Sequence, residues 1–121
     1  MKERIQRTGA LASSVHFSGL EQYYNYETGA LYYNGLDYSN HAITIVGWDD
    51  EFSSNDFLDN KAVGAWIIKN SWGTDWGYDG FGYLSYQQHL GFGYTFIFDD
   101  DGLFGCSRIY GFWNNLQKTI I

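Results

Sequence analysis

Two strand-like runs separated by an acidic connection constrain the fold of this chain more than any other feature. The first, HAITIVGW, covers residues 41–48, and the second, AWIIKN, covers residues 65–70. Both are rich in β-branched and aromatic side chains, which fit the pleated surface of a sheet. The polar connection of residues 49–64 lets the chain reverse between them. The sequence therefore predicts two neighbouring antiparallel strands, with the end of the second beside the start of the first.

This pairing would bring a histidine and an asparagine together. His41 starts the first strand, and alternation along the second places Trp66, Ile68, Asn70 and Trp72 on one face. An asparagine side-chain oxygen can accept a hydrogen bond from an imidazole N–H, which fixes the ring and leaves its other nitrogen free to act on a nucleophile. Trp72 would exclude water from this bond and so strengthen it. We expect the His41 and Asn70 side chains to be hydrogen bonded, with the Trp72 ring packed over them.

The rest of the chain predicts further strands and short helices. Aromatic residues make up 21% of the chain and there are 15 glycines, a balance that favours strands and tight turns. We expect a single domain over residues 1–121 of the α+β class: a mainly antiparallel sheet or partial barrel with short helices. Residues 99–121 have weak periodicity and receive no assignment. The other predicted elements are helices over 2–8 and 18–26, the second opened by a capping box of Ser18 and Glu21, and strands over 10–17, 29–35, 83–88 and 93–100.

Composition excludes several classes of function. The net charge of −7 argues against nucleic acid as a partner, because phosphate binding needs a basic face. No apolar run approaches the roughly 20 residues that span a bilayer, so no membrane association is expected. His16 and His89 lack partners at metal-ligand spacing, and neither the acidic connection nor the DDDG of residues 99–102 has the ligand spacing of a calcium loop. We therefore expect no metal and no other cofactor.

The stretches NHAITIVGW and AWIIKNSWGTDWGYDGFGYLSY resemble the C-terminal half of papain-like cysteine peptidases. The upstream stretches GALASSVHF and YYNYETGALYYNG resemble the same half, so that the likeness covers roughly residues 1–98. The acidic GWDD connection is similar to that of bacterial members. The resemblance implies the β lobe of the papain-like fold, which faces a mostly helical lobe across the active-site cleft. It also implies an extracellular or cell-surface location.

The resemblance implies a role for five residues. His41 matches the catalytic histidine, Asn70 the asparagine that orients it, and Trp72 the tryptophan that shields the pair. Asn40 matches the residue whose backbone carbonyl meets the substrate, and Ser13 falls near a position that lines the main specificity pocket.

The nucleophile of the family is missing from the expected place. In this family it lies roughly 130 residues before the histidine, with the oxyanion-hole glutamine shortly before it. The single cysteine here, Cys106, follows Asn70 in a glycine-flanked segment. This position does not predict the helix N-terminus that lowers the pKa of such a thiol. We therefore expect the chain to be incomplete and inactive alone.

Three functions compete at this point. The first is the catalytic lobe of a peptidase that acts on peptide or protein substrates together with a Cys-bearing helical lobe. The second is a non-catalytic peptide-binding or interaction module derived from such a peptidase. The third is a carbohydrate-binding β domain, which would show an exposed aromatic row and no His41–Asn70 contact. A binding module needs no oriented imidazole, so the presence of His41, Asn70 and Trp72 together favours the first function. A lobe without its partner would also expose an apolar face and tend to self-associate.

Overall fold

The computed structural model describes residues 1–17, 20–59, 61–98, 106–113 and 116–120. Two short helices and nine strands make up most of this part of the chain. The elements are α1 (Lys2–Thr8), β1 (Leu11–Val15), α2 (Leu20–Tyr23), β2 (Tyr24–Asn25), β3 (Ala30–Leu31), β4 (His41–Asp49), the 3-10 turn η1 (Ser54–Asp56), β5 (Ala65–Lys69), β6 (Phe81–Ser85), β7 (Leu90–Phe98), β8 (Cys106–Trp113) and β9 (Leu116–Ile120).

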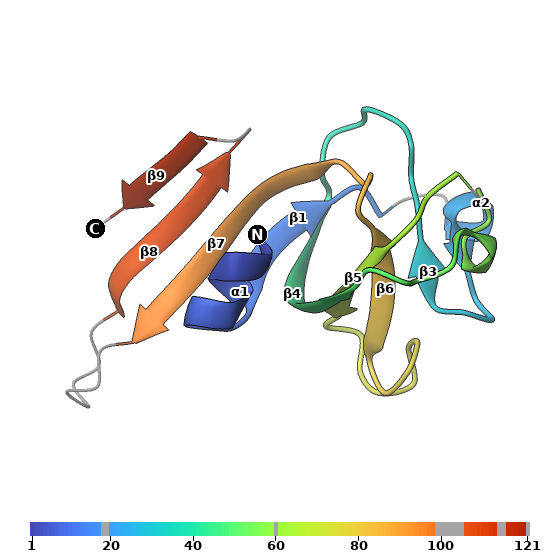
Figure 1. Cartoon of the computed structure of the whole chain (residues 1–121), viewed down its shortest axis with the longest axis horizontal. Coiled ribbons are helices and arrows are strands. Elements are labelled where there is room, and N and C mark those ends of the chain that lie inside the picture. The colour runs from blue at the N-terminus through green and yellow to red at the C-terminus, as the bar shows by residue number, and fades with distance from the viewer. Residues whose placement is uncertain (18–19, 60, 99–105, 114–115, 121) are drawn as a thin grey trace.

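The described strands form one sheet in the order β2-β3-β6-β5-β4-β1-β7-β8-β9. The β3–β6 pair is parallel and the other paired strands run antiparallel, so the expectation of a mainly antiparallel sheet is confirmed. Figure 1 shows β7, β8 and β9 extending away from the strands that carry the central part of the sheet. Within the described residues the sheet is open, with β2 and β9 at its edges.

The β4–β5 pair is the element that positions the candidate site. Its register places Ile45 opposite Ile68 and Trp48 opposite Trp66, with an irregularity between Ile45 and Gly47. The start of β4 therefore lies beside the end of β5, as the sequence predicts. On its other side β4 pairs with β1, and His41 lies opposite Val15.

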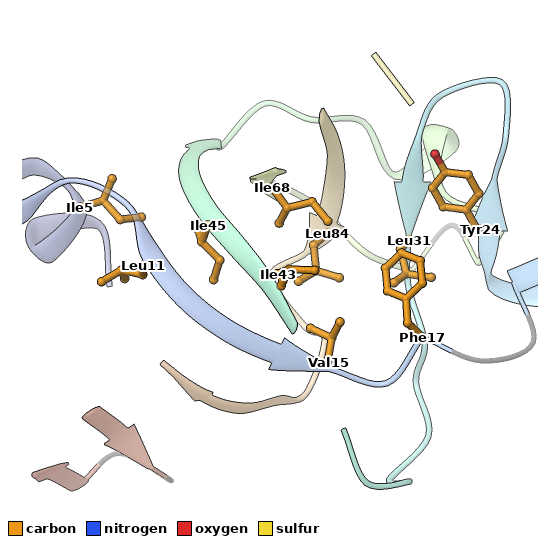
Figure 2. Packing of buried hydrophobic residues seen from close by; sticks show 10 residues of the cluster. All are labelled: Ile5, Leu11, Val15, Phe17, Tyr24, Leu31, Ile43, Ile45, Ile68 and Leu84. Atoms are coloured by element: carbon orange, nitrogen blue, oxygen red, sulfur yellow. The ribbon is translucent and has the colours of Figure 1, made fainter. Parts of the chain in front are cut away.

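The core lies on one face of the central strands. Alternate residues of β1, β4 and β5 point into it, because successive side chains of a strand face opposite ways. Figure 2 shows these side chains converging, with Phe17 and Tyr24 extending the cluster beyond β1 towards α2. The members are Ile5, Leu11, Val15, Phe17, Tyr24, Leu31, Ile43, Ile45, Ile68 and Leu84.

The acidic connection contains more structure than its charge suggests. Its acidic side chains lie at or near the surface, as is usual for a run of charges. Phe52, Phe57 and Ala62 are nevertheless buried, and they form a second small core with Ala30 and Ala65. The turn is therefore anchored to β3 and β5 by apolar contacts, which a reading of its charges alone missed.

Several predicted element boundaries shift in the structure. The strand expected over 29–35 is limited to Ala30–Leu31, and the strand expected over 83–88 starts at Phe81 and ends at Ser85. At that end a turn forms, in which the Gln88 N–H donates to the Ser85 carbonyl at 3.0 Å.

The second helix and the C-terminal segment also differ from the sequence prediction. The helix expected over 18–26 is reduced to Leu20–Tyr23 and followed directly by β2, while the capping-box residue Ser18 lies outside the described residues. The unassigned segment 99–121 contributes β8 and β9 to the sheet; residues 99–105, 114–115 and 121 lie outside the described part. No described helix is long and apolar enough to cross a membrane.

Candidate active site

A hydrogen bond joins the two residues that the sequence singles out. His41 Nε2 lies 2.9 Å from Asn70 Oδ1, which confirms the expected contact. Asn70 is only 4% exposed, and its backbone N–H donates to the Gly80 carbonyl at 2.9 Å. This backbone hydrogen bond fixes Asn70 against the loop that follows β5. His41, at the start of β4, is partly exposed and remains accessible.

The direction of this hydrogen bond follows from a third group. The backbone N–H of Ser71 donates to the same Asn70 Oδ1 at 2.8 Å. Only the oxygen of the amide can accept this bond, so the oxygen must face His41 as well. The Nε2 atom of His41 is then the donor and carries the hydrogen. In a neutral imidazole this leaves Nδ1 as the basic nitrogen.

This geometry predicts the tautomer of His41. In long-range ¹H–¹⁵N spectra of the neutral imidazole, we expect His41 to show the Nε2–H tautomer. Substitution Asn70→Ala should convert this signal into a mixture of tautomers, because the acceptor that selects one of them is gone. The exposed His89 serves as the internal control and should not change. A dominant Nδ1–H form of His41 in the unsubstituted chain would contradict the assignment.

Two aromatic rings pack against the imidazole. The Trp72 ring centroid lies 4.8 Å from that of His41 with the planes tilted by 42°, and the Phe17 centroid lies 4.9 Å away. Trp72 is 46% exposed, so its ring packs against His41 while part of it meets solvent. Excluding water from one side strengthens the hydrogen bond beneath it.

Sequence reasoning missed Phe17, which follows the end of β1. The signal that could have found it is the β1–β4 pairing, which places the residues after Val15 beside His41. Asn40 fixes this segment, because its Oδ1 accepts from the Phe17 N–H at 2.7 Å and its N–H donates to the Val15 carbonyl at 3.0 Å. The structure thus gives the Asn40 side chain a positioning contact, while the substrate contact of its carbonyl remains a prediction.

The structure places Ser13 away from the surface. Ser13 is 2% exposed and lies opposite Ile43, on the face of β1 that points into the core. Its neighbour Ser14 faces the other way, opposite the exposed Ala42. Ser14 is also buried, at 7% exposure, so the role of Ser13 in a specificity pocket stays a prediction.

His16 lies in surroundings different from those of His41. His16 stacks on Tyr33 with 4.3 Å between ring centroids, and its Nδ1 lies 3.0 Å from the Tyr38 carbonyl. Tyr33 in turn donates a hydrogen bond to Asp37, which raises the pKa of the Tyr33 phenol. These contacts hold the loop before His41. Within the described part of the chain, no three His, Cys, Asp or Glu side chains gather closely enough to bind a metal.

A charged contact between residues far apart in the sequence holds α1 against the sheet. Lys2 forms an ion pair with Asp50, and the Tyr86 hydroxyl donates to the same carboxylate at 2.7 Å. Both contacts lower the pKa of Asp50, with Lys2 as the larger cause. All three side chains are at the surface or partly exposed, so we assign them a role in positioning α1 and none in chemistry.

Comparison with known proteins places these residues in a family context. A family model described as papain family cysteine protease matches residues 1–95. The viral cathepsin of Heliothis zea nuclear polyhedrosis virus is 37% identical over 81 residues, which cover 67% of this chain and 19% of that protein. Cathepsin K of Mus musculus is 31% identical over 97 residues, covering 78% of this chain and 26% of that protein.

A solved structure supports the same relation. The cysteine protease and lectin-like domains of Cwp84, a surface layer associated protein of Clostridium difficile, superpose with a TM-score of 0.62 at 31% identity. The match covers 73% of this chain and 20% of that one. The chain thus spans about a fifth to a quarter of the length of the proteins it matches here, between 19% and 26%.

Proposed function

Because this chain belongs to the papain family of cysteine proteases, we propose that it forms the His- and Asn-bearing β lobe of a two-lobed peptidase that hydrolyses peptide bonds. The observation that carries the proposal is the hydrogen bond of His41 to Asn70 beneath Trp72. A module that only binds peptides would need a shaped surface but no imidazole with one selected tautomer. Neutral Asn70 fixes that tautomer without adding a charge.

The proposed reaction uses a cysteine from a second, helical lobe. Its proton passes to Nδ1 of His41, so that a thiolate and an imidazolium face each other. The thiolate attacks the scissile carbonyl, and His41 returns the proton to the leaving amine as the C–N bond breaks. Water then adds to the thioester, giving its proton to His41, and the acid product leaves as the thiol is restored. Asn70 accepts from Nε2 throughout and keeps the ring in place.

Cys106 does not suit the role of nucleophile in this scheme. Its backbone begins β8, in the part of the sheet beyond β7, whereas His41 begins β4. A reactive thiol is usually held at a helix N-terminus or beside a cation, where the thiolate is stabilised. The strand position offers no helix dipole.

This proposal predicts inactivity of the 121-residue chain and activity after completion. The chain alone should give no thiol-dependent hydrolysis of a broad peptide substrate. Expression together with the coding sequence upstream of Met1 should give hydrolysis that iodoacetamide blocks, provided that this sequence encodes a helical segment with a Gln followed by a Cys. Turnover by the isolated chain that survives Cys106→Ser would contradict the scheme. An upstream region without such a segment would favour the non-catalytic binding module instead.

We propose an extracellular or cell-surface location for the complete protein. The support comes from the solved relative Cwp84, which is described as a surface layer associated protein. Fractionation of the source cells with an antibody against residues 1–98 would test this location. Recovery in the cytosolic fraction alone would contradict it.

A further inference from the structure

A row of aromatic rings leads away from the candidate catalytic histidine. From His41 the contacts run through Trp72 at 4.8 Å, Trp76 at a further 5.9 Å, Tyr24 at 5.5 Å and Tyr26 at 4.9 Å between successive centroids. We call the four residues Trp72, Trp76, Tyr24 and Tyr26 the aromatic row. The row joins the loop after β5 to the β2–β3 turn, two segments far apart in the sequence.

The two ends of the row reach solvent. Trp72 is 46% exposed and Tyr26 is 69% exposed, while Tyr24 is buried beneath them at 3%. Tyr78 lies beside the same turn at 56% exposure, where its hydroxyl donates to the Glu27 carbonyl at 3.1 Å. Large exposed rings are costly to leave in water and are typical of surfaces that bind a partner.

Three of the aromatic residues on this surface have an acidic residue directly beside them in the sequence. Glu27 follows Tyr26, Asp75 precedes Trp76 and Asp79 follows Tyr78 in the sequence, and all three acids are exposed. None of them forms an ion pair with a residue in the described ranges. The wider field has the same sign, because residues 8–60 contain no lysine or arginine. Exposed π-faces beside unpaired carboxylates attract cations, and the effect of the two adds.

At the edge of this surface, the protein already contains one contact between a cation and an aromatic ring. The Lys69 ammonium lies 5.0 Å from the centre of the Phe81 ring, which is 38% exposed. Lys69 is the basic residue nearest to this segment in the sequence. Among the described residues, no cation is found over a ring of the aromatic row.

We propose that the aromatic row and its flanking acids select polypeptides with lysine or arginine on the leaving-group side of the scissile bond. The inference rests on the proposed peptidase function. His41 delivers its proton to the leaving amine, and the row begins at the ring packed against His41. The segment of substrate that starts at this amine is therefore the one that can lie along the row. Its basic side chains would stack on Trp72 and Tyr26 and face Glu27, Asp75 and Asp79.

The first test uses the two-lobed protease and fluorogenic peptides that differ only after the scissile bond. Lysine there should raise kcat/KM by about 5- to 20-fold over norleucine, the range expected when a cation meets an aromatic face and carboxylates. The advantage should shrink in high salt, because exposed charges are screened. The double substitution Tyr26→Leu with Glu27→Gln should remove most of the advantage of the lysine peptide over the norleucine peptide. The exposed acid Glu51, on the turn after β4, gives the matched control Glu51→Gln, which should keep the advantage.

The outcomes separate this inference from the proposed function. Equal cleavage of both peptides, or a preference for norleucine, would overturn the inference and leave the peptidase function standing. Failure to cleave any peptide would overturn the function. In that case the inference is decided by titrating the ¹⁵N-labelled chain with the same peptides. Shifts of the Trp72 and Trp76 indole N–H signals by the lysine peptide alone support it, and shifts by an oligosaccharide but by neither peptide would assign the row to sugars instead.

Discussion

Replacement of His41 by alanine is expected to lower kcat of the two-lobed protease by about a thousandfold or more, since acid–base catalysis by one side chain contributes roughly 10²–10⁴-fold and the thiolate also loses its partner. The imidazole both accepts the thiol proton and returns it to the leaving amine, so no other described side chain can replace it in this scheme. KM should change little, because His41 acts mainly on the reacting atoms.

The design of this experiment separates chemistry from folding. His89→Ala, at an exposed position, is the matched control and should keep full activity. Asn70→Ala should lower kcat by a smaller factor, about 10- to 100-fold, because Asn70 acts by orienting His41. In the His41→Ala background the second change should add almost nothing. Independent, multiplying effects of the two substitutions would show that Asn70 does not act through the imidazole.

The second large effect, a loss of folding stability, is expected on substitution of Gly77 in the loop that follows β5. Its φ of +59° is unfavourable for residues with a side chain, and an added Cβ would lie 2.1 Å from the Phe81 carbonyl oxygen. That oxygen also accepts the Tyr78 N–H at 2.8 Å, so the turn cannot move without losing a hydrogen bond. Backbone strain and overpacking each cost about 1–3 kcal/mol. We expect Gly77→Ala to lower the free energy of unfolding by about 2–5 kcal/mol.

Gly73 offers a control in the same loop. Its φ is +83°, but an added Cβ would meet no atom within 4 Å. Gly73→Ala should therefore cost only the backbone strain, about 1 kcal/mol. Urea unfolding of both variants, followed by tryptophan fluorescence, measures the difference. Equal losses at the two positions would show that the contact with the Phe81 carbonyl is not what makes Gly77 necessary.

The contact between His41 and Asn70 could be predicted because the features that determine it are local in the sequence. The strand propensity of residues 41–48 and 65–70 is strong, and the antiparallel pair they form fixes which ends meet. Once His41 and Asn70 are placed at those ends, their contact follows from geometry. Trp72 follows from the same alternation, continued for one more pair of residues.

The features that escaped prediction depend on contacts between distant segments. Phe17 reaches His41 only because β1 pairs with β4, and Tyr24 reaches Trp76 only because the β2–β3 turn meets the loop after β5. Burial of Phe52 and Phe57 in the acidic connection is a tertiary effect of the same kind, since their sequence neighbours are mostly polar.

The order of strands in the sheet has a consequence for how the chain acquires its structure. The β4–β5 pair joins segments close in the sequence, whereas β3 must find β6 as a parallel neighbour and β1 must find β7 across most of the described chain. Longer loops add little to the free-energy cost, about 0.6 kcal/mol for each doubling, but non-local pairing slows folding markedly. The hairpin that carries His41 and Asn70 can therefore form early, while the β3–β6 and β1–β7 contacts limit the rate. The His41–Asn70 pair would thus be assembled before the proposed substrate-binding surface is complete.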